Sequence, residues 1–304
     1  MRIYSHPACL LHDPGPGHPE TIARLQNVIE ALRTAFPPLD WHSAPLATRE
    51  QLARVHTREL IAAVLDTAVA QAVRLDEDTV LSAGSAQAAL HASGAAIAAV
   101  DALCTGEITR AFCAVRPPGH HATAGTAMGF CLFNHVAVAA AHALAAHGLV
   151  RVAIVDFDVH HGNGTQAIFE NDSRVLYASS HQSPLYPGSG MEVERGLGNV
   201  FNAPLPPGSN ATLFRAAWSE RLLPAIDAFA PELVLVSAGF DAHRLDPLAD
   251  MNLEAEDYRW LGAELARLAD RHAGGRLGST LEGGYSLTAL RECSVAYLSG
   301  LGAS

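Results

Sequence analysis

Short runs of apolar residues that alternate with helical patterns limit most strongly how this chain of 304 residues can fold. The runs predict strands at Ile3–Ser5, Ala111–Val115, Val152–Phe157, Val175–Ser179, Leu233–Ser237 and Leu277–Leu281. Segments with helical periodicity predict helices at Glu20–Phe36, Arg58–Val73, Ala86–Leu103, His135–His147, Thr212–Phe229, Glu256–His272 and Leu287–Leu298. Apolar strands separated by helices are typical of a parallel sheet covered on both faces. The sequence therefore predicts a single α/β domain over residues 1–304, with a parallel β-sheet flanked by helices on both faces.

The charged residues remove several kinds of chemistry. All 20 basic residues are arginine, and the chain contains no lysine. Schiff-base enzymes, phosphate-binding loops that end in Gly-Lys-Ser/Thr and protein kinases each need a lysine, so the sequence excludes them. The 31 acidic residues give a formal net charge of −11, and the arginines form no cluster. We therefore expect no nucleic-acid partner.

The sequence indicates neither a membrane nor an oxidising compartment. The most apolar stretches, residues 84–104 and 134–150, are interrupted by His or Asp. Neither provides the uninterrupted span of about 20 apolar residues that a membrane requires. No apolar leader precedes the first predicted strand, and the 5 cysteines are scattered without Cys-x-x-Cys spacing. We therefore expect a cytoplasmic protein that has no membrane partner and no cysteine-based zinc module.

Imidazole, carboxylate and phenol side chains follow several of the predicted strands directly. In open parallel sheets, ligands bind outside the carboxyl ends of the strands, so these side chains should meet at one edge of the sheet. They are His120 and His121 after the strand at 111–115, Asp156, Asp158, His160 and Asn163 around the end of the strand at 152–157, Asp241 after the strand at 233–237, and Tyr285 after the strand at 277–281.

Asp158, His160 and Asp241 have the composition of a metal site. Asp158 and His160 are two residues apart where a strand ends, so both side chains point the same way. With Asp241 from another strand they provide three ligands, which leaves a position open for water, as in catalytic zinc sites. Zinc lowers the pKa of such a water to about 7 and polarises a bound carbonyl.

The pair His120-His121 allows two interpretations: a structural pair of histidines, or two residues with different catalytic roles. Asp156 and Asn163 flank the metal segment and can orient one ring each. A carboxylate partner favours a charged imidazole, whereas an amide partner lets the ring stay neutral and act as a base. We assign His121 with Asn163 as general base and then acid, and His120 with Asp156 as electrostatic support. The sequence does not determine which histidine takes which partner.

Tyr285 follows two glycines that permit a tight turn and close backbone approach. Its phenol can donate a hydrogen bond to the oxygen of a carbonyl that becomes tetrahedral. Gly-Gly-Tyr alone is also a common turn, so this role depends on the other motifs.

Four motifs occur in order along the chain: Arg116-Pro-Pro-Gly-His-His, Asp156-Phe-Asp-Val-His-His-Gly-Asn-Gly-Thr165, Ser237-Ala-Gly-Phe-Asp241 and Glu282-Gly-Gly-Tyr285. Together they resemble the histone deacetylase superfamily, and most closely its class II branch and bacterial relatives, which include the acetylpolyamine amidohydrolases. The resemblance extends from His12-Asp13 and His18-Pro-Glu through Tyr285. It implies an arginase/deacetylase fold and a zinc-dependent deacetylase that hydrolyses linear amide C–N bonds.

The resemblance also implies roles for individual residues. Asp158, His160 and Asp241 would hold one zinc ion per chain, His120 and His121 would flank the water, and Tyr285 would polarise the acyl carbonyl. Phe130 (after Gly129) and Tyr186 match the aromatic pair that walls an acyl-lysine tunnel. A structural potassium ion would be held by Asp156, Ser179 and the backbone of Asp158 and His160.

Leu248 bears on the substrate. Polyamine deacetylases of this family tend to have an acidic residue seven positions after the last zinc ligand, where this chain has Leu248. An acid would attract a cationic polyamine, which leucine cannot do. We therefore expect acylated lysine in proteins or peptides, with acetylpolyamine or another small N-acyl amine as the alternative, because Asp246 and Asp250 lie close by. The oligomeric state stays open between monomer and homo-oligomer.

Two other interpretations are weaker. A binuclear manganese ureohydrolase would share the fold, but Gly162 stands where a bridging acid belongs and His243 where a second acid belongs. A non-catalytic protein that binds acylated ligands would not need to retain His121 and Tyr285. Cys131, beside Phe130, is either a redox-sensitive thiol near the tunnel or a buried and inert one.

Overall fold

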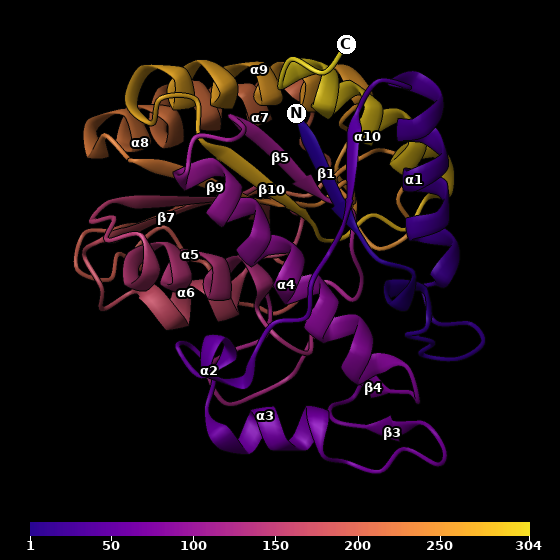
Figure 1. The fold of residues 1–304 in the computed structure, drawn as a ribbon. Helices are drawn as coiled ribbons and strands as arrows, with labels where there is room; N and C mark the ends of the chain where they lie inside the picture. Colours follow the sequence, from indigo (N-terminus) through magenta and orange to yellow (C-terminus); the bar gives the residue numbers. More distant parts are fainter.

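The central layer of the computed structural model, which describes residues 1–304, is a sheet of eight parallel strands (Figure 1). Their order across the sheet is β2-β1-β5-β10-β9-β6-β7-β8. The predicted parallel α/β sheet is confirmed. The strands are β1 (Arg2–Ser5), β2 (Asp40–Ser43), β5 (Arg110–Cys113), β6 (Val152–Asp156), β7 (Val175–Gln182), β8 (Val200–Leu205), β9 (Leu233–Ala238) and β10 (Leu277–Leu281).

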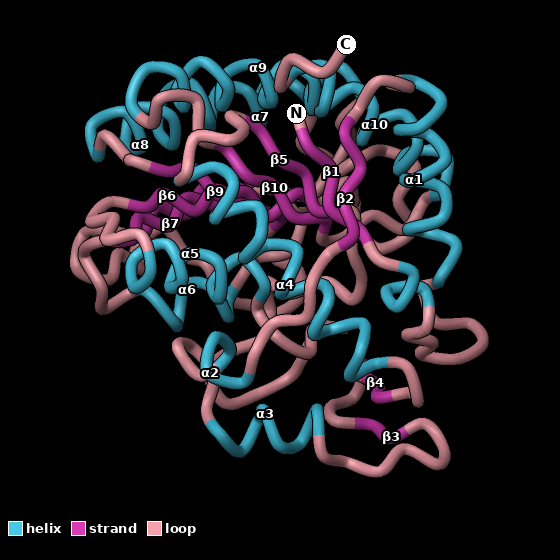
Figure 2. The backbone as a smooth tube through the Cα atoms, viewed as in Figure 1, coloured by secondary structure: helices cyan, strands magenta, loops and turns pink.

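Helices cover both faces of this sheet, as Figure 2 shows. One face carries α4 (Ser85–Cys104), α5 (His135–Ala146) and α6 (Asn163–Phe169). The other face carries α1 (Ile22–Ala35), α7 (Ala211–Ala217), a π-helical turn (Trp218–Leu222), α8 (Leu223–Phe229), α9 (Ala255–His272) and α10 (Leu287–Gly300).

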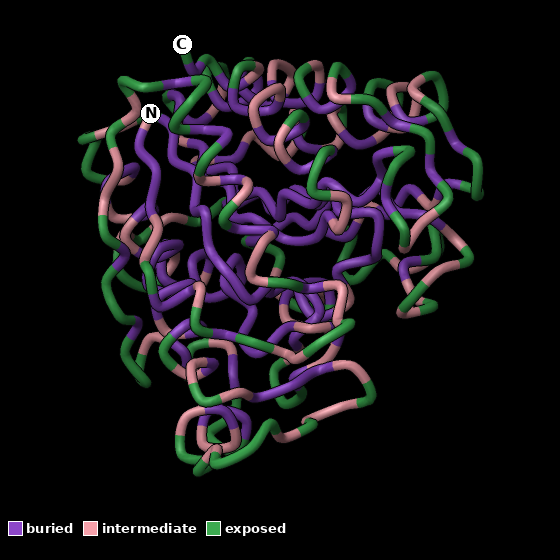
Figure 3. The backbone as a smooth tube through the Cα atoms, turned by 90° about the vertical axis from the view of Figure 1, so that its right-hand side faces the viewer, coloured by how far each residue is buried: buried purple, intermediate pink, exposed green.

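Burial follows these layers, because the buried residues concentrate in the sheet and on the helix faces turned toward it (Figure 3). Every residue of β6, β7, β9 and β10 is buried, which explains why these strands contain continuous apolar runs. The sheet therefore holds the ends of these strands, where the polar motifs begin, in fixed positions.

Helix α4 is long and apolar enough to span a membrane by length and composition alone. It packs instead on β1, β5 and β10 and against α5, and 67% of its most apolar window is buried inside the protein. Its Gly94 approaches the backbone so closely that a Cβ there would lie 2.0 Å from the carbonyl oxygen of Pro45. This helix is a core element of the fold.

The sequence-based prediction missed both edge strands and a small hairpin. β2 is only partly buried and β8 contains Asn202 and Pro204, so neither shows a continuous apolar run. The hairpin pairs two residues in each of β3 (Val73–Arg74) and β4 (Val80–Leu81), which is too short for a periodic signal. Also missed were the single helical turns η1 (Pro7–Leu10) and α2 (Arg49–Leu52), and helix α6.

Two predicted helices have different bounds in the structure. The helix expected at 58–73 is α3 (Arg58–Leu65), and it ends there because the polar residues that follow cap it; the Thr67 hydroxyl donates to the carbonyl of Ala63. The helix expected at 212–229 contains the π-helical turn at Trp218, whose side chain is fully buried and donates to Ser180.

Candidate active site

The motif residues after β5, β6, β9 and β10 gather around one cavity of about 240 Å³. The residues predicted to wall a tunnel do line this cavity, together with His121, His160 and Tyr285. The full lining is Asp78, His121, Gly129, Phe130, His160, Leu185, Tyr186, Leu248 and Tyr285. Sequence reasoning missed Asp78, which the β3–β4 hairpin brings to the site, and Leu185.

Asp158, His160 and Asp241 converge behind this cavity, with ligand atoms that all lie within 4.8 Å of one another. The Nδ1 atom of His160 is 3.1 Å from Asp158 Oδ1 and 3.3 Å from Asp241 Oδ2. The second oxygen of each carboxylate accepts from the backbone: Asp158 Oδ2 from Gly283 N–H, and Asp241 Oδ1 from Val159 N–H, each at 2.8 Å. Asp241 Oδ2 is buried without a hydrogen-bond partner, so a cation would satisfy an atom that the protein leaves bare.

The charges of this cluster also fit a cation. Burial and the nearby Asp158 charge raise the pKa of Asp241 to about 7. Burial alone would lower the pKa of His160, but its hydrogen bond with Asp158 and the nearby Asp241 carboxylate raise it to about 10. Two carboxylates this close in a dry site repel each other. A divalent cation with one imidazole and two carboxylate ligands would remove that repulsion, and the donor set suits zinc.

Gly283 lets the backbone approach the cluster. A Cβ at this position would lie 2.0 Å from Asp241 Oδ2 and 2.6 Å from Asp158 Oδ2. Any side chain here would therefore displace both carboxylates, which gives the Gly-Gly-Tyr motif a role that a simple turn does not have.

The two adjacent histidines have the partners that we assigned to them. His120 Nδ1 donates to Asp156 Oδ2 at 3.0 Å, and His121 Nδ1 donates to Asn163 Oδ1 at 2.8 Å. Burial would lower the pKa of His120, but the Asp156 and Asp158 carboxylates outweigh it and raise the pKa to about 10. Burial and the neighbouring His120 charge hold the pKa of His121 well below its usual value. His120 is therefore charged and His121 neutral at pH 7.

Glu282 holds the backbone of the histidine pair, a role that sequence reasoning missed. Its Oε2 atom accepts from the N–H of Gly119 at 2.6 Å and of His120 at 3.2 Å. Its Oε1 atom accepts from the hydroxyl of Ser237 at 2.9 Å. The signal available in the sequence is its place at the end of β10, directly before Gly283.

The loop that carries Tyr285 is fixed from both sides. The backbone N–H of Tyr285 donates to Asp246 Oδ2 at 2.7 Å. The guanidinium carbon of Arg24 lies over the Tyr285 ring, 4.9 Å from the ring centroid. Arg24 is fully buried and donates to the carbonyls of Gly284 and Glu282. Burial raises the pKa of Tyr285 well above its usual value, so the phenol stays protonated. Arg24 and Asp246 were not predicted as site residues, because only the tertiary fold brings them to this loop.

The residues expected to hold potassium are neighbours. Asp156 and Ser179 are register partners on the adjacent strands β6 and β7, and Asp158 and His160 directly follow β6. The Ser179 hydroxyl lies 2.9 Å from His181 Nδ1, and Asp156 Oδ1 accepts from the N–H of Asp158. Potassium binding stays a prediction.

The side chains of Cys131 and His243 are both buried. Burial raises the pKa of the Cys131 thiol well above its usual value, which disfavours the reactive thiolate. His243 is 1% exposed and turns toward Glu254, with 3.3 Å between Nε2 and a carboxylate oxygen. Neither residue lines the cavity.

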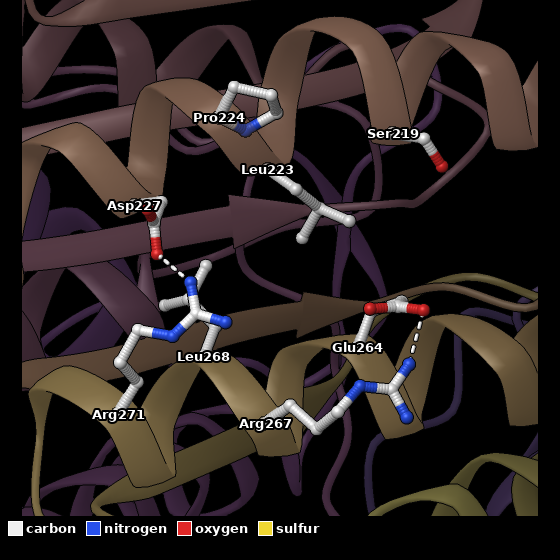
Figure 4. Close-up of a pocket in the computed structure, with 8 residues that line it drawn as sticks. All are labelled: Ser219, Leu223, Pro224, Asp227, Glu264, Arg267, Leu268 and Arg271. Atoms are coloured by element: carbon white, nitrogen blue, oxygen red, sulfur yellow. Dashed lines mark hydrogen bonds and ion pairs between the residues drawn. The ribbon is translucent and has the colours of Figure 1, made fainter.

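A larger groove of about 360 Å³ lies between α8 and α9, but its charges are already paired (Figure 4). Arg271 pairs with Asp227, and Arg267 pairs with Glu264. No histidine or unpaired carboxylate lines this groove, so it offers no catalytic group.

Comparison with known proteins agrees with this fold. Residues 18–301 match the profile of the histone deacetylase domain. The chain is 39% identical to a histone deacetylase-like amidohydrolase of Pseudomonas aeruginosa, over 95% of this chain and 83% of that protein. It is 41% identical to the human polyamine deacetylase HDAC10, over 82% of this chain and 39% of that protein. The crystal structure of the HDA15 HD domain superposes with a TM-score of 0.93 at 37% identity, covering 100% of this chain and 88% of that one.

The parallel sheet covered on both faces and the match to this domain define a protein of an α/β family of deacetylases and amidohydrolases. The chain belongs to the histone deacetylase family.

Proposed function

We propose that this protein is a zinc-dependent deacylase that hydrolyses N-acyl amides of lysine side chains. One observation carries the proposal: the cluster of Asp158, His160 and Asp241 adjoins a cavity that His121 and Tyr285 line. When bound, zinc supplies Lewis-acid chemistry, which acidifies water and polarises a carbonyl.

His121 is the proton carrier in this proposal. Because Asn163 Oδ1 can only accept, the Nδ1 atom of His121 carries the hydrogen of their bond and Nε2 keeps a lone pair. Nε2 takes the proton from the attacking water and then gives it to the leaving amine. The charged His120, held by Asp156, stabilises negative charge that develops beside it.

Tyr285 stabilises the acyl oxygen. Its phenol remains protonated and faces the cavity, so it can donate to the oxygen as the carbonyl becomes tetrahedral. Arg24 and Asp246 fix the loop, so the donor is in position before the reaction begins.

The cavity wall supports an extended aliphatic substrate. Phe130 and Tyr186 present aromatic surfaces, and Leu185 and Leu248 add apolar ones. The ring centroid of Tyr186 is 5.1 Å from that of His121, edge to face, so the wall continues to the proton carrier. An acylated lysine side chain has a neutral, apolar stem that suits such a channel.

A small acetylated polyamine is the second candidate, and one observation favours it. Asp78 lines the cavity, and its hairpin also carries Asp76 and Glu77. Burial raises the pKa of Tyr186, and these three carboxylates raise it further, so the mouth has a negative potential despite Leu248. A negative mouth attracts a cationic substrate.

A panel of acyl-lysine peptides, acetylpolyamines and small N-acyl amines, compared by kcat/KM, tests the proposal. We expect the peptides to have the highest kcat/KM, and removal of metal by a chelator to abolish turnover until zinc is restored. Leu248→Glu should raise relative polyamine turnover, and the matched variant Asp78→Asn should lower it. Higher kcat/KM for acetylpolyamines in the unmodified protein would favour the second candidate. Failure to hydrolyse any N-acyl amide with zinc bound would favour a non-catalytic binder.

Gly162 argues against a binuclear ureohydrolase. A Cβ at this position would lie 2.2 Å from Asp156 Oδ2 and 2.6 Å from the Tyr177 hydroxyl, so no bridging carboxylate fits. Metal analysis that gave two manganese ions at the cluster of Asp158, His160 and Asp241 would overturn this conclusion.

A further inference from the structure

Two histidines and an aspartate meet where α4 and α5 end, outside the candidate active site. Asp101 lies in the last turn of α4, His142 in the last turns of α5, and His147 directly after α5. The Nε2 atoms of both histidines lie 2.7 Å from the same oxygen, Asp101 Oδ1. We call these three residues the helix-end cluster.

We propose that the helix-end cluster is a second metal site, which binds a divalent transition-metal ion such as zinc. Two imidazole nitrogens and one carboxylate oxygen, all within 4.8 Å of one another, are a donor set that zinc accepts. The side chain of Asp101 is 50% exposed, that of His147 20% and that of His142 7%. Solvent therefore reaches the site and can complete the coordination. The carboxyl ends of both helices add negative potential, which favours a cation.

Only a small movement is needed to admit the ion. Ligand atoms about 2 Å from a tetrahedral zinc are roughly 3.3 Å apart, compared with 2.7 Å between each Nε2 atom and Asp101 Oδ1. Asp101 is the most exposed of the three side chains, so its carboxylate can move outward while the histidines keep their places.

Arg54 competes with the metal through the tautomer of His142. Its guanidinium donates to His142 Nδ1 at 2.5 Å, so Nε2 carries the hydrogen that points to Asp101. Binding through Nε2 requires that hydrogen to leave and Nδ1 to become the protonated nitrogen, which Arg54 opposes both as a donor and as a positive charge. Arg54 is exposed, so it can turn away into solvent when the ion binds.

A metal ion here would join the ends of α4 and α5 and stabilise the folded chain by mass action. The cluster shares no residue with the cavity, so occupancy should leave turnover unchanged.

The test is equilibrium dialysis of the full-length zinc-loaded protein against buffered free zinc, with zinc per chain, Tm and turnover as readouts. We expect the protein to bind a second zinc ion and its Tm to rise when this ion binds. His147→Gln should weaken binding of the second ion by more than about tenfold, because loss of a residue that only hydrogen-bonds to a metal ligand already lowers metal affinity by that factor. His272→Gln is the matched control, because His272 pairs with Asp227 at 2.8 Å with similar exposure but has no second histidine. It should keep the second ion.

Arg54→Met gives an independent readout. It should tighten binding of the second zinc ion by about tenfold, the equivalent of one hydrogen bond from a charged donor. If His147→Gln does not fold, Asp101→Asn removes the anionic ligand at constant size and should give the same loss. The proposal is overturned if the second zinc ion still binds in His147→Gln and Asp101→Asn, or if the unmodified protein binds no second ion. These variants change no residue of the candidate active site. They therefore test zinc binding at the helix-end cluster separately from the zinc proposed for the active site.

Discussion

His120 lies against the carboxylate of Asp156, whereas His121, the next residue, lies against the amide of Asn163. The two side chains are almost equally buried, at 2% and 4% exposed. Their ring centroids are 4.0 Å apart, yet one pKa is raised to about 10 and the other is held well below its usual value. Burial alone would keep both neutral. The carboxylates of Asp156 and Asp158 beside His120 give that ring its charge, and this charge together with burial keeps His121 neutral.

The strongest test removes one ring at a time. His121→Ala should lower kcat/KM by about 10²–10⁴-fold, because the general base is lost. His120→Ala should cost less, about 10–100-fold, because a supporting partner is lost while the base remains. Zinc content and circular dichroism serve as controls for the fold. Equal losses in the two variants would contradict the division of roles.

Removing the carboxylate partner should change both rings. Asp156→Asn lowers the pKa of His120, and a less fully charged His120 suppresses the pKa of His121 less. The neutral form of His121 is the active one, so a higher pKa moves the acid limb of the pH–rate profile to higher pH. We expect kcat to fall by about 10–100-fold as well. Tyr177→Phe, which removes only the hydroxyl that donates to Asp156, should leave the limb in place.

The converse substitution makes the partners alike. Asn163→Asp places a charge against His121 and should raise its pKa. The acid limb of the pH–rate profile should then move to higher pH, while activity on the alkaline side of the profile changes little. An unaltered pH–rate profile would show that His121 is not the group whose protonation limits the rate.

Two other buried histidines, His56 and His135, should also stay neutral in the folded protein, and this should make its stability depend on pH. Burial lowers the pKa of His56 and of His135 to about 4. Between pH about 6.5 and 4 the unfolded chain takes up protons on these residues and the folded chain does not. The free energy of unfolding should therefore decrease as the pH is lowered through this window, by about 1.4 kcal/mol per pH unit for each such histidine. Urea unfolding at pH 7.5 and 5.5 measures this fall, and His56→Gln should make it shallower. An equal slope in both proteins would contradict the assignment.

The sequence predicted the inner strands and the site for the same physical reason. Strands such as β6 and β9 are buried on both faces, so their apolar runs are continuous and end abruptly at Asp156 and before Asp241. The candidate metal ligands and the histidine pair therefore stand out at the ends of these runs. The edge strand β2 has a neighbour on one side only and tolerates Asp40 and His42, so its pattern is lost.

The supporting residues were hidden because their partners are distant in sequence. Arg24 and Gly284 are separated by 260 positions, and Asp246 and Tyr285 by 39. A buried arginine or a loop aspartate carries no local pattern that reveals such a partner. The helix-end cluster was hidden for the same reason, since 41 positions separate Asp101 from His142.

The position of β10 in the sheet affects how the protein can be made. This strand comes after all the others in the sequence, yet it lies between β5 and β9 and pairs with both. During synthesis the chain must therefore emerge as far as Leu281 before the two halves of the sheet can join. Until then β5 and β9 each present an open edge, the kind of surface that pairs with other chains and aggregates. Recovery of this protein from an expressing cell should therefore depend on chaperones that shield the nascent half-sheets.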